Sequence, residues 1–151
     1  MNKKQKSLTN KGFSLVELII VIAIMAVLIG VLAPQYLKYV ERSRNSTDKN
    51  NASAIVSAVQ VWGAETVIPA GETALATDAA GTKVTVNASG TTVEASKTNT
   101  DAITSALKNA GISLTDTKCV SKTSWTAYNL TFKVDTNGVV SVTYDPEDIG
   151  K

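Results

Sequence analysis

The chain begins with a polar, basic segment that gives way to a long apolar run. Residues 18–33 contain no ionisable side chain, and between Lys11 and Lys38 the only charged residue is Glu17. A helix rises about 1.5 Å per residue, so residues 13–37 would extend about 37 Å, enough to cross a hydrocarbon core about 30 Å thick. We therefore predict a membrane-spanning helix over residues 13–37.

An amphipathic stretch continues the same predicted helix to residue 62. Its apolar residues recur at helical spacing and should pack against a sheet; they are Ala52, Ile55, Val59 and Trp62. Its polar residues are expected to face outward; they are Arg42, Arg44, Asp48 and Lys49. Gly63 is a predicted stop signal, because glycine commonly ends helices.

Residues 125–144 show the clearest strand pattern. Apolar side chains alternate with polar ones in two runs, which are Tyr128, Leu130, Phe132, Val134 and then Val140, Val142, Tyr144. A two-residue loop at Asn137 and Gly138 would place Val134 opposite Ser141 and mix the two faces. A three-residue loop over residues 136–138 instead pairs Val134 with Val140. We therefore predict the longer loop, with Gly138 left-handed in a bulge.

Residues 64–100 are rich in Ala, Thr, Gly and Ser, and we expect an exposed connection with little regular structure. Short strands near residues 83–86 and 91–94 could form a weak hairpin. A second helix is predicted over residues 100–110, capped by Thr100 or Asp101 and ended by Gly111. Its apolar stripe comprises Ile103, Ala106, Leu107 and Ala110. The predicted fold class is α+β: a long N-terminal helix whose second half packs on an antiparallel β-sheet head.

Glu17 stands at the edge of the predicted membrane span. An ionised, unpaired carboxylate inside a bilayer costs about 2.5–3.5 kcal/mol or more, so a simple anchor would omit it. Its presence indicates a partner charge inside the membrane. Phe13 lies one helical turn earlier on the same face, and a free α-amine there would carry such a charge. A second, displaced copy of the helix could bring its amine to Glu17.

The run Lys11-Gly12-Phe13-Ser14-Leu15-Val16-Glu17 resembles the type IV prepilin signature. The resemblance covers about residues 11–34. It implies that a membrane peptidase cuts after Gly12, that Phe13 becomes the methylated N-terminus, and that Glu17 directs assembly. The domains are then a leader peptide (1–12), a transmembrane and assembly helix (13–37), and a globular head (38–151) that includes the second half of the long helix.

Gly30 and Pro34 lie four residues apart inside the predicted helix. Pro34 has no N–H to donate to the carbonyl of Gly30, and glycine at the same turn adds a further helix penalty. The pair is compatible with a tolerated kink in a membrane helix. The resemblance implies the other interpretation, in which this stretch unwinds when the subunit leaves the lipid and enters a filament.

The charge distribution argues against nucleic-acid binding. Four of the 15 basic residues and none of the 13 acidic ones lie in residues 1–12, so a chain cut after Gly12 has 11 basic against 13 acidic side chains. Residues 63–151 carry seven basic and ten acidic residues. The basic leader fits a cytoplasmic N-terminus. A secretory signal peptide fits less well, because its cleavage site would follow the apolar region.

Other chemistry is sparse. Cys119 is the only cysteine, so no intramolecular disulfide can form, and a small buried hydrophobic residue is the commoner role for such a cysteine. The chain has no histidine and no cluster with metal-ligand spacing. An acidic run at Asp145, Glu147 and Asp148 is more typical of a solvated surface than of a cation site. We predict no enzymatic activity, no cofactor and no metal.

Three functional classes follow from these residues. The first is the structural subunit of a type IV pilus, serving adhesion, aggregation or surface motility. The second is a minor pilin or pseudopilin of a type II secretion or DNA-uptake machine, and the third is an anchored adhesin that never polymerises. For the first class the resemblance implies a single-pass protein of the inner (cytoplasmic) membrane with its head outside, later part of an extracellular pilus. Its partners would be other pilin copies, the prepilin peptidase and N-methyltransferase, the assembly platform and its ATPase.

Overall fold

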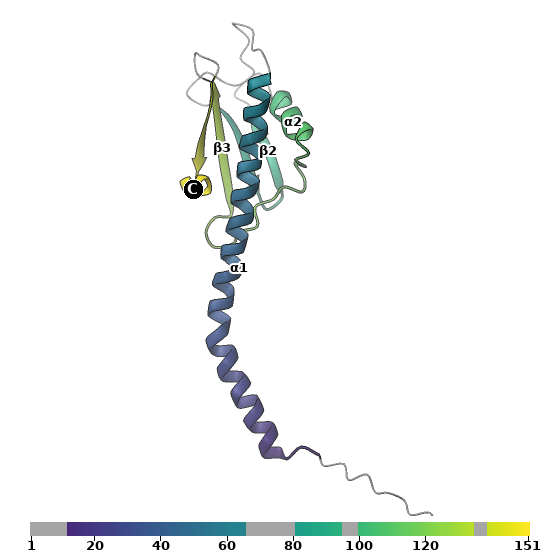
Figure 1. Cartoon of the computed structure of the whole chain (residues 1–151), viewed down its shortest axis with the longest axis vertical. Helices are drawn as coiled ribbons and strands as arrows, with labels where there is room; N and C mark the ends of the chain where they lie inside the picture. The colour runs from purple at the N-terminus through teal and green to yellow at the C-terminus, as the bar shows by residue number, and fades with distance from the viewer. Residues whose placement is uncertain (1–11, 66–80, 95–99, 135–138) are drawn as a thin grey trace, which may run out of the picture. The chain divides into compact units, whose positions relative to one another are not determined.

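The structure, a computed structural model, describes residues 12–65, 81–94, 100–134 and 139–151. Its elements (Figure 1) are α1 (Leu15–Glu65), β1 (Thr82–Asn87), β2 (Gly90–Glu94), α2 (Thr100–Asn109), β3 (Ala127–Val134), β4 (Val140–Asp145) and the 3₁₀ helix η1 (Glu147–Gly150). The chain divides after Tyr39 into an N-terminal unit and a head. The long helix followed by an antiparallel sheet confirms the predicted α+β class.

The strands of the head form an antiparallel sheet in the order β2-β1-β3-β4. The register of β3 and β4 pairs Val134 with Val140 and Phe132 with Val142, as predicted from the apolar faces. The loop predicted over residues 136–138 lies outside the described residues. The alternating burial along β3 shows that the period-two pattern identified the buried face of this strand correctly.

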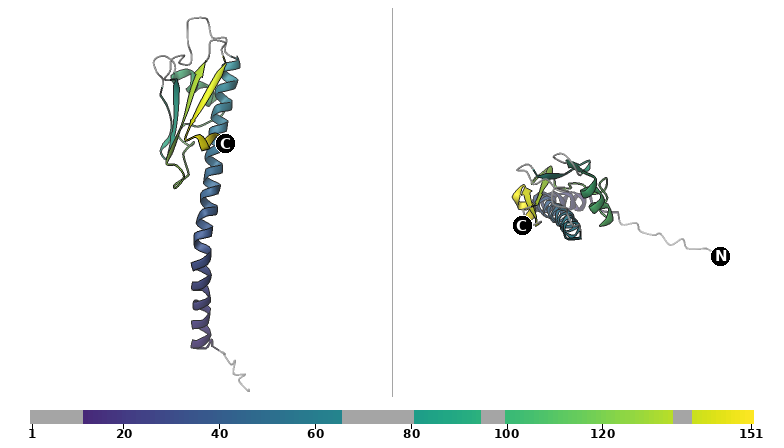
Figure 2. Two further views of the ribbon diagram at one scale, coloured as in Figure 1. Left: turned by 90° about the vertical axis from the view of Figure 1, so that its left-hand side faces the viewer. Right: turned by 90° about the horizontal axis from the view of Figure 1, so that it is seen from above.

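The second half of α1 packs along one face of this sheet (Figure 2). Of the four residues predicted for this contact, Ala52, Ile55 and Val59 are fully buried and Trp62 is half-buried against the core. The two largest fully buried side chains, Tyr128 and Phe132, come from β3 of this sheet. The predicted packing of the helix on the sheet is therefore confirmed.

The hairpin of β1 and β2 corrects one expectation. Residues 82–94 are regular, and β1 is a central strand in which Val84 and Val86 are fully buried. The hairpin predicted near residues 83–86 and 91–94 is confirmed. The expectation of little regular structure was wrong there, because β1 also pairs with β3, 40–50 residues later. Residues 66–80 and 95–99 of the same stretch lie outside the described residues.

The second helix is confirmed, with two qualifications. Ile103, Ala106 and Leu107 are buried as predicted, but Ala110 is exposed because α2 has already ended. Gly111, at φ 78°, closes the helix, and the N–H of Ile112 returns to the carbonyl of Leu107 at 2.9 Å. The side chains of Thr100 and Asp101, the predicted caps, lie outside the described residues.

Two predictions about α1 were wrong. The helix does not stop at Gly63 but runs to Glu65. Gly63 serves packing instead, since a Cβ there would come within 2.7 Å of Val140 Cγ2 on β4. Asp48, expected to face outward, is completely buried. Its carboxylate is satisfied by donors from a distant loop, described below.

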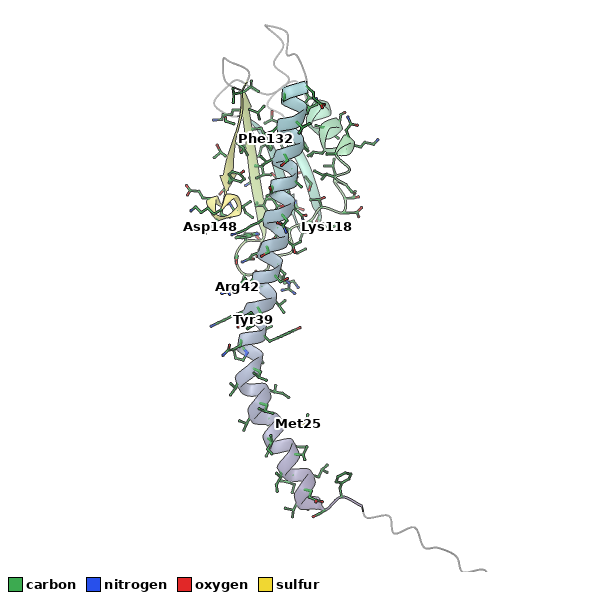
Figure 3. All side chains as sticks on the ribbon, viewed as in Figure 1. Met25, Tyr39, Arg42, Lys118, Phe132 and Asp148 are labelled. Carbon is green, nitrogen blue, oxygen red and sulfur yellow. The ribbon has the colours of Figure 1, made fainter. Side chains whose placement is uncertain are left out.

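The N-terminal unit consists of the first half of α1. Every described side chain from residue 12 to residue 39 is exposed. Figure 3 shows side chains, among them the labelled Met25 and Tyr39, projecting outward from the helix. By length and composition, α1 is apolar enough near the N-terminus to cross a membrane. These exposed apolar side chains therefore need a lipid or protein environment.

Candidate functional site

The N-terminus of α1 is closed by two hydrogen bonds that involve Ser14. The Ser14 hydroxyl oxygen accepts the N–H of Val16 at 3.3 Å, and Glu17 Oε2 accepts the N–H of Ser14 at 2.9 Å. This is a variant of the capping box: the serine before the helix binds an N–H of the first turn, and the glutamate three residues later binds the N–H of that serine. Glu17 therefore caps its own helix within one chain.

The predicted processing site immediately precedes this cap. Nothing lies within 4 Å of where a Cβ on Gly12 would stand, and the Phe13 side chain is 92 % exposed. Lys11, the first residue of the resemblance, lies outside the described residues. Gly12 and Phe13 thus stand just before α1, which begins at Leu15, and Glu17 lies in the first turn of the helix. The predicted pairing of Glu17 with the amine of a neighbouring copy involves a second chain and stays a prediction.

Gly30 and Pro34 lie inside α1, which is helical through both positions. Both residues are exposed, and a Cβ on Gly30 would meet nothing within 4 Å. In the single chain, then, neither residue interrupts the helix. Unwinding of this stretch on assembly remains a prediction.

A second polar site lies in the head, where Asp48 holds a loop that we call the strap (residues 119–125). Asp48 Oδ1 accepts the N–H of Val120 at 2.9 Å. Its Oδ2 accepts the N–H of Ser121 at 2.9 Å and the indole N–H of Trp125 at 2.8 Å. The thiol of Cys119 stands 3.5 Å from the same oxygen. A buried carboxylate normally carries a large desolvation penalty, and these donors offset it.

Glu41, two helical turns before Asp48, binds the other part of the strap. Its Oε1 accepts four hydrogen bonds, from the Ser121 hydroxyl at 2.6 Å and from the N–H groups of Lys122 at 2.9 Å, Thr123 at 2.8 Å and Ser124 at 3.3 Å. Its Oε2 lies 3.5 Å from Arg44 Nη1. Two carboxylates of one helix therefore fix the strap, which leads directly into β3.

The sequence contained a signal for this site that residue type concealed. Stepping back from Ile55 along the buried face of α1 by seven residues leads to Asp48, and by seven more to Glu41. Both carboxylates therefore lie on the stripe that packs against the head. Carboxylates usually face water, and for that reason the position of these two residues on the buried stripe does not by itself predict burial. The groups that donate hydrogen bonds to them lie 71–83 residues further along the chain, so the sequence pattern does not reveal them.

Cys119 is buried, as predicted for a small hydrophobic residue, and it is a free thiol. Burial raises the pKa of its thiol from 9.0 to about 11, and the nearby charge of Asp48 adds to the effect. Since the thiolate is the reactive form, Cys119 is a poor nucleophile at neutral pH in the folded head.

The hydrogen bonds to Glu41 predict how the stability of the head depends on pH. The Ser121 hydroxyl, followed by the backbone donors of the strap, holds the pKa of Glu41 far below its ordinary 4.5. A carboxylate whose pKa falls on folding stabilises the fold above its unfolded-state pKa and loses that contribution as the pH drops toward the folded value. The advantage of wild type over Glu41→Gln in free energy of unfolding should therefore be full above about pH 5.5 and shrink below about pH 4.5.

Denaturation of both full-length proteins in detergent, repeated from about pH 7 to pH 3, measures this difference. An advantage that stays constant over the whole series would contradict the assignment of Glu41 as an ionised acceptor.

Comparison with known proteins places the N-terminal segment in a recognised class. Residues 8–33 match the family described as the prokaryotic N-terminal methylation motif. No solved structure matches the chain. The matched segment overlaps the prepilin-like residues 11–34 at all positions but Pro34, and it includes Gly12, Phe13 and Glu17.

Curated relatives carry pilin and fimbrial names. The chain is 41% identical over 49 residues to the type IV major pilin protein PilA of Myxococcus xanthus, covering 32% of this chain and 22% of that protein. It is 39% identical over 57 residues to prepilin peptidase-dependent protein A of Clostridium perfringens, covering 38% and 41%. It is 36% identical over 105 residues to fimbrial protein EcpC of Eikenella corrodens, covering 68% and 65%. The chain thus spans less than two thirds of the length of each.

Proposed function

We propose that this protein, a type IV pilin by its N-terminal motif and by the names of its relatives, is a structural subunit of a type IV pilus. The observation that carries the proposal is the match of residues 8–33 to the methylation motif, together with a helix from Leu15 that is long and apolar enough to cross a membrane. The helix would anchor the subunit in the membrane before assembly and join the pilus on the cell surface afterwards. Adhesion, aggregation and surface motility are all compatible with such a subunit.

Processing creates the charge that Glu17 needs. In the uncut chain, the nitrogen of Phe13 belongs to a neutral peptide bond, and Glu17 is bound to the N–H of Ser14. A cut after Gly12 turns that nitrogen into a cationic α-amine, and N-methylation keeps the positive charge. Pairing this amine with Glu17 of a neighbouring copy would offset the desolvation of both charges in an apolar environment.

The capping box adds a second role for the same carboxylate. By satisfying a free donor at the helix end, Glu17 stabilises the first turn of α1 in a single chain. Its carboxylate also has lone pairs left to accept from a second donor. We infer that Glu17 keeps its cap while it takes the amine of a neighbour, so that assembly adds a contact without breaking one.

The stretch from Gly30 to Pro34 would be the place where α1 adapts to the filament. The helix lacks one hydrogen bond there because Pro34 has no N–H, and Gly30 has low helix propensity. Local unwinding would lengthen this stretch and change how neighbouring helices pack. The single chain is helical throughout this stretch, so unwinding would be a change that accompanies assembly.

The alternative is a minor pilin or pseudopilin of a secretion or DNA-uptake machine. The Clostridium perfringens relative is named only for its dependence on prepilin peptidase, which any subunit processed in this way would share. The excess of acidic over basic residues from residue 63 onward disfavours a DNA-binding head. We infer a role in the pilus body, with prepilin peptidase, an assembly platform and its ATPase as the partners required.

Gly12→Ile should block processing of the subunit. A bulky side chain beside the cut would obstruct the peptidase, so the uncleaved precursor should accumulate in the membrane and no fibres should form. Immunoblotting for precursor and mass spectrometry of fibres sheared from wild-type cells test this directly. The wild-type fibres should contain the subunit with methylated Phe13 at its N-terminus.

Asn10→Ala provides a matched control, because it changes the leader next to the site without placing bulk at the cut. It should be processed normally. Wild-type fibres that retain residues 3–12 would overturn the assignment of Gly12 as the cut site.

A further inference from the structure

One oxygen of Glu41 collects an unusual set of donors. The N–H groups of three successive residues, 122–124, and the hydroxyl of Ser121 all lie within 3.3 Å of Oε1. Successive backbone N–H groups that point into one concavity form an anion-binding nest. Glu41 occupies this nest from outside the loop, since it comes from α1, 80 or more residues earlier in the chain.

We propose that residues 121–124 form a carboxylate-binding site that Glu41 fills in the same chain and that a free carboxylate can fill when Glu41 is removed. The site supplies four hydrogen-bond donors to one oxygen, and Arg44 stands 3.5 Å from the other. Donors to a charged acceptor form the stronger class of hydrogen bonds, and a guanidinium suits a planar carboxylate. The ligand class is therefore a small monocarboxylate.

The site should outlast the loss of Glu41, because Asp48 holds the strap independently. Val120 and Ser121 donate their N–H groups to Asp48, and Trp125 closes the far end of the strap through its indole N–H. These three bonds bracket the nest on both sides. Asp48 is also completely buried, so this attachment is protected from solvent.

The atoms that Glu41→Ala removes show which small carboxylate should be used to test the site. Glu41→Ala keeps Cβ and removes one methylene carbon and the carboxylate, which together have the size and charge of acetate. Acetate should therefore occupy the nest, whereas chloride at the same concentration and ionic strength should bind it less well. Formate, one carbon smaller, should have an intermediate effect.

Hydrogen exchange of the full-length protein in detergent tests the proposal. In Glu41→Ala, protection of the amides of residues 122–124 should fall by about tenfold or more, the size expected when charge-assisted hydrogen bonds are lost. Sodium acetate should restore much of this protection, and sodium chloride should not. Amides of β3 should keep wild-type protection, which shows that the head is still folded.

Two variants sharpen the test. Ser121→Ala in the Glu41→Ala background removes a donor from the nest and should weaken the acetate effect. Glu65→Ala, which removes an exposed carboxylate from the end of the same helix, should change neither protection nor its response to acetate. Should Glu41→Ala fold poorly without added salt, acetate and not chloride must restore the fold.

Unchanged protection in Glu41→Ala would show that Asp48 alone orders the strap, and lost protection that acetate cannot restore would show that the nest does not accept a free carboxylate. Either result would overturn the proposal. The measurement requires no fibres, so its outcome is independent of the proposed role in a pilus.

Discussion

Replacing Glu17 by glutamine is expected to abolish or severely reduce fibres while leaving the helix cap in place. Glutamine can accept the N–H of Ser14 as glutamate does, so the capping box should persist. The methylated amine of Phe13 in a neighbouring copy would lose its counter-charge, and breaking a buried charge pair of this kind costs about 3–5 kcal/mol. Processing should survive, because the cut lies a full turn away. Fibre yield from sheared cells that contain no other copy of the subunit measures the effect.

Two companion variants separate charge from capping. Glu17→Val removes both, and it should be membrane-resident, normally cleaved and without fibres. Ser14→Ala removes the hydroxyl that accepts from Val16 but keeps the Glu17 carboxylate, so it should still form fibres. Wild-type yield from Glu17→Gln would mean that assembly requires only the cap, and the charge pairing would have to be abandoned.

Asp48→Ala should be the most destabilising single change in the polar part of the head. It leaves the N–H groups of Val120 and Ser121 and the indole N–H of Trp125 without their acceptor. Each unsatisfied buried donor costs about 1–3 kcal/mol, and we expect a total loss of about 3–5 kcal/mol after relaxation. Chemical denaturation of the full-length protein, followed by tryptophan fluorescence, measures the change.

Asp48→Asn should lose less, because an amide oxygen still accepts, although its NH₂ group faces the donors on the other side. Asn50→Ala changes an exposed position on the same helix and should stay within about 0.5 kcal/mol of wild type. An Asp48→Ala protein as stable as Asn50→Ala would show that the strap does not depend on this carboxylate.

Periodicity predicted the apolar packing well, because it is a local property of the sequence. The alternation along β3 identified its buried face, and the need to match the faces of two strands identified the register of Val134 with Val140. The stripe through Ile55 and Val59 likewise identified the face of α1 that packs on the sheet. Each of these required only the spacing of residues within one or two neighbouring elements.

Features that depend on distant partners were missed. Gly63 was interpreted as a helix end, because only the approach of Val140, 77 residues later, shows why a side chain is excluded there. Asp48 was predicted to face outward, because the groups that donate to its carboxylate belong to the strap, more than 70 residues later, and a local pattern does not reveal them.

The helix cap formed by Ser14 and Glu17 is a local feature, and the S-x-x-E spacing is enough to recognise it. A membrane role was considered for Glu17 instead.

The burial of Cys119 makes the protein suitable for cross-linking through introduced cysteines. It is the only cysteine in the sequence, it is buried, and its thiol stays protonated at neutral pH. A single cysteine introduced on the exposed surface of the head would therefore react with maleimide or oxidise without competition from a native thiol. Pairs of such cysteines, oxidised on intact cells, could map which faces of neighbouring heads meet, with the native residue left in place.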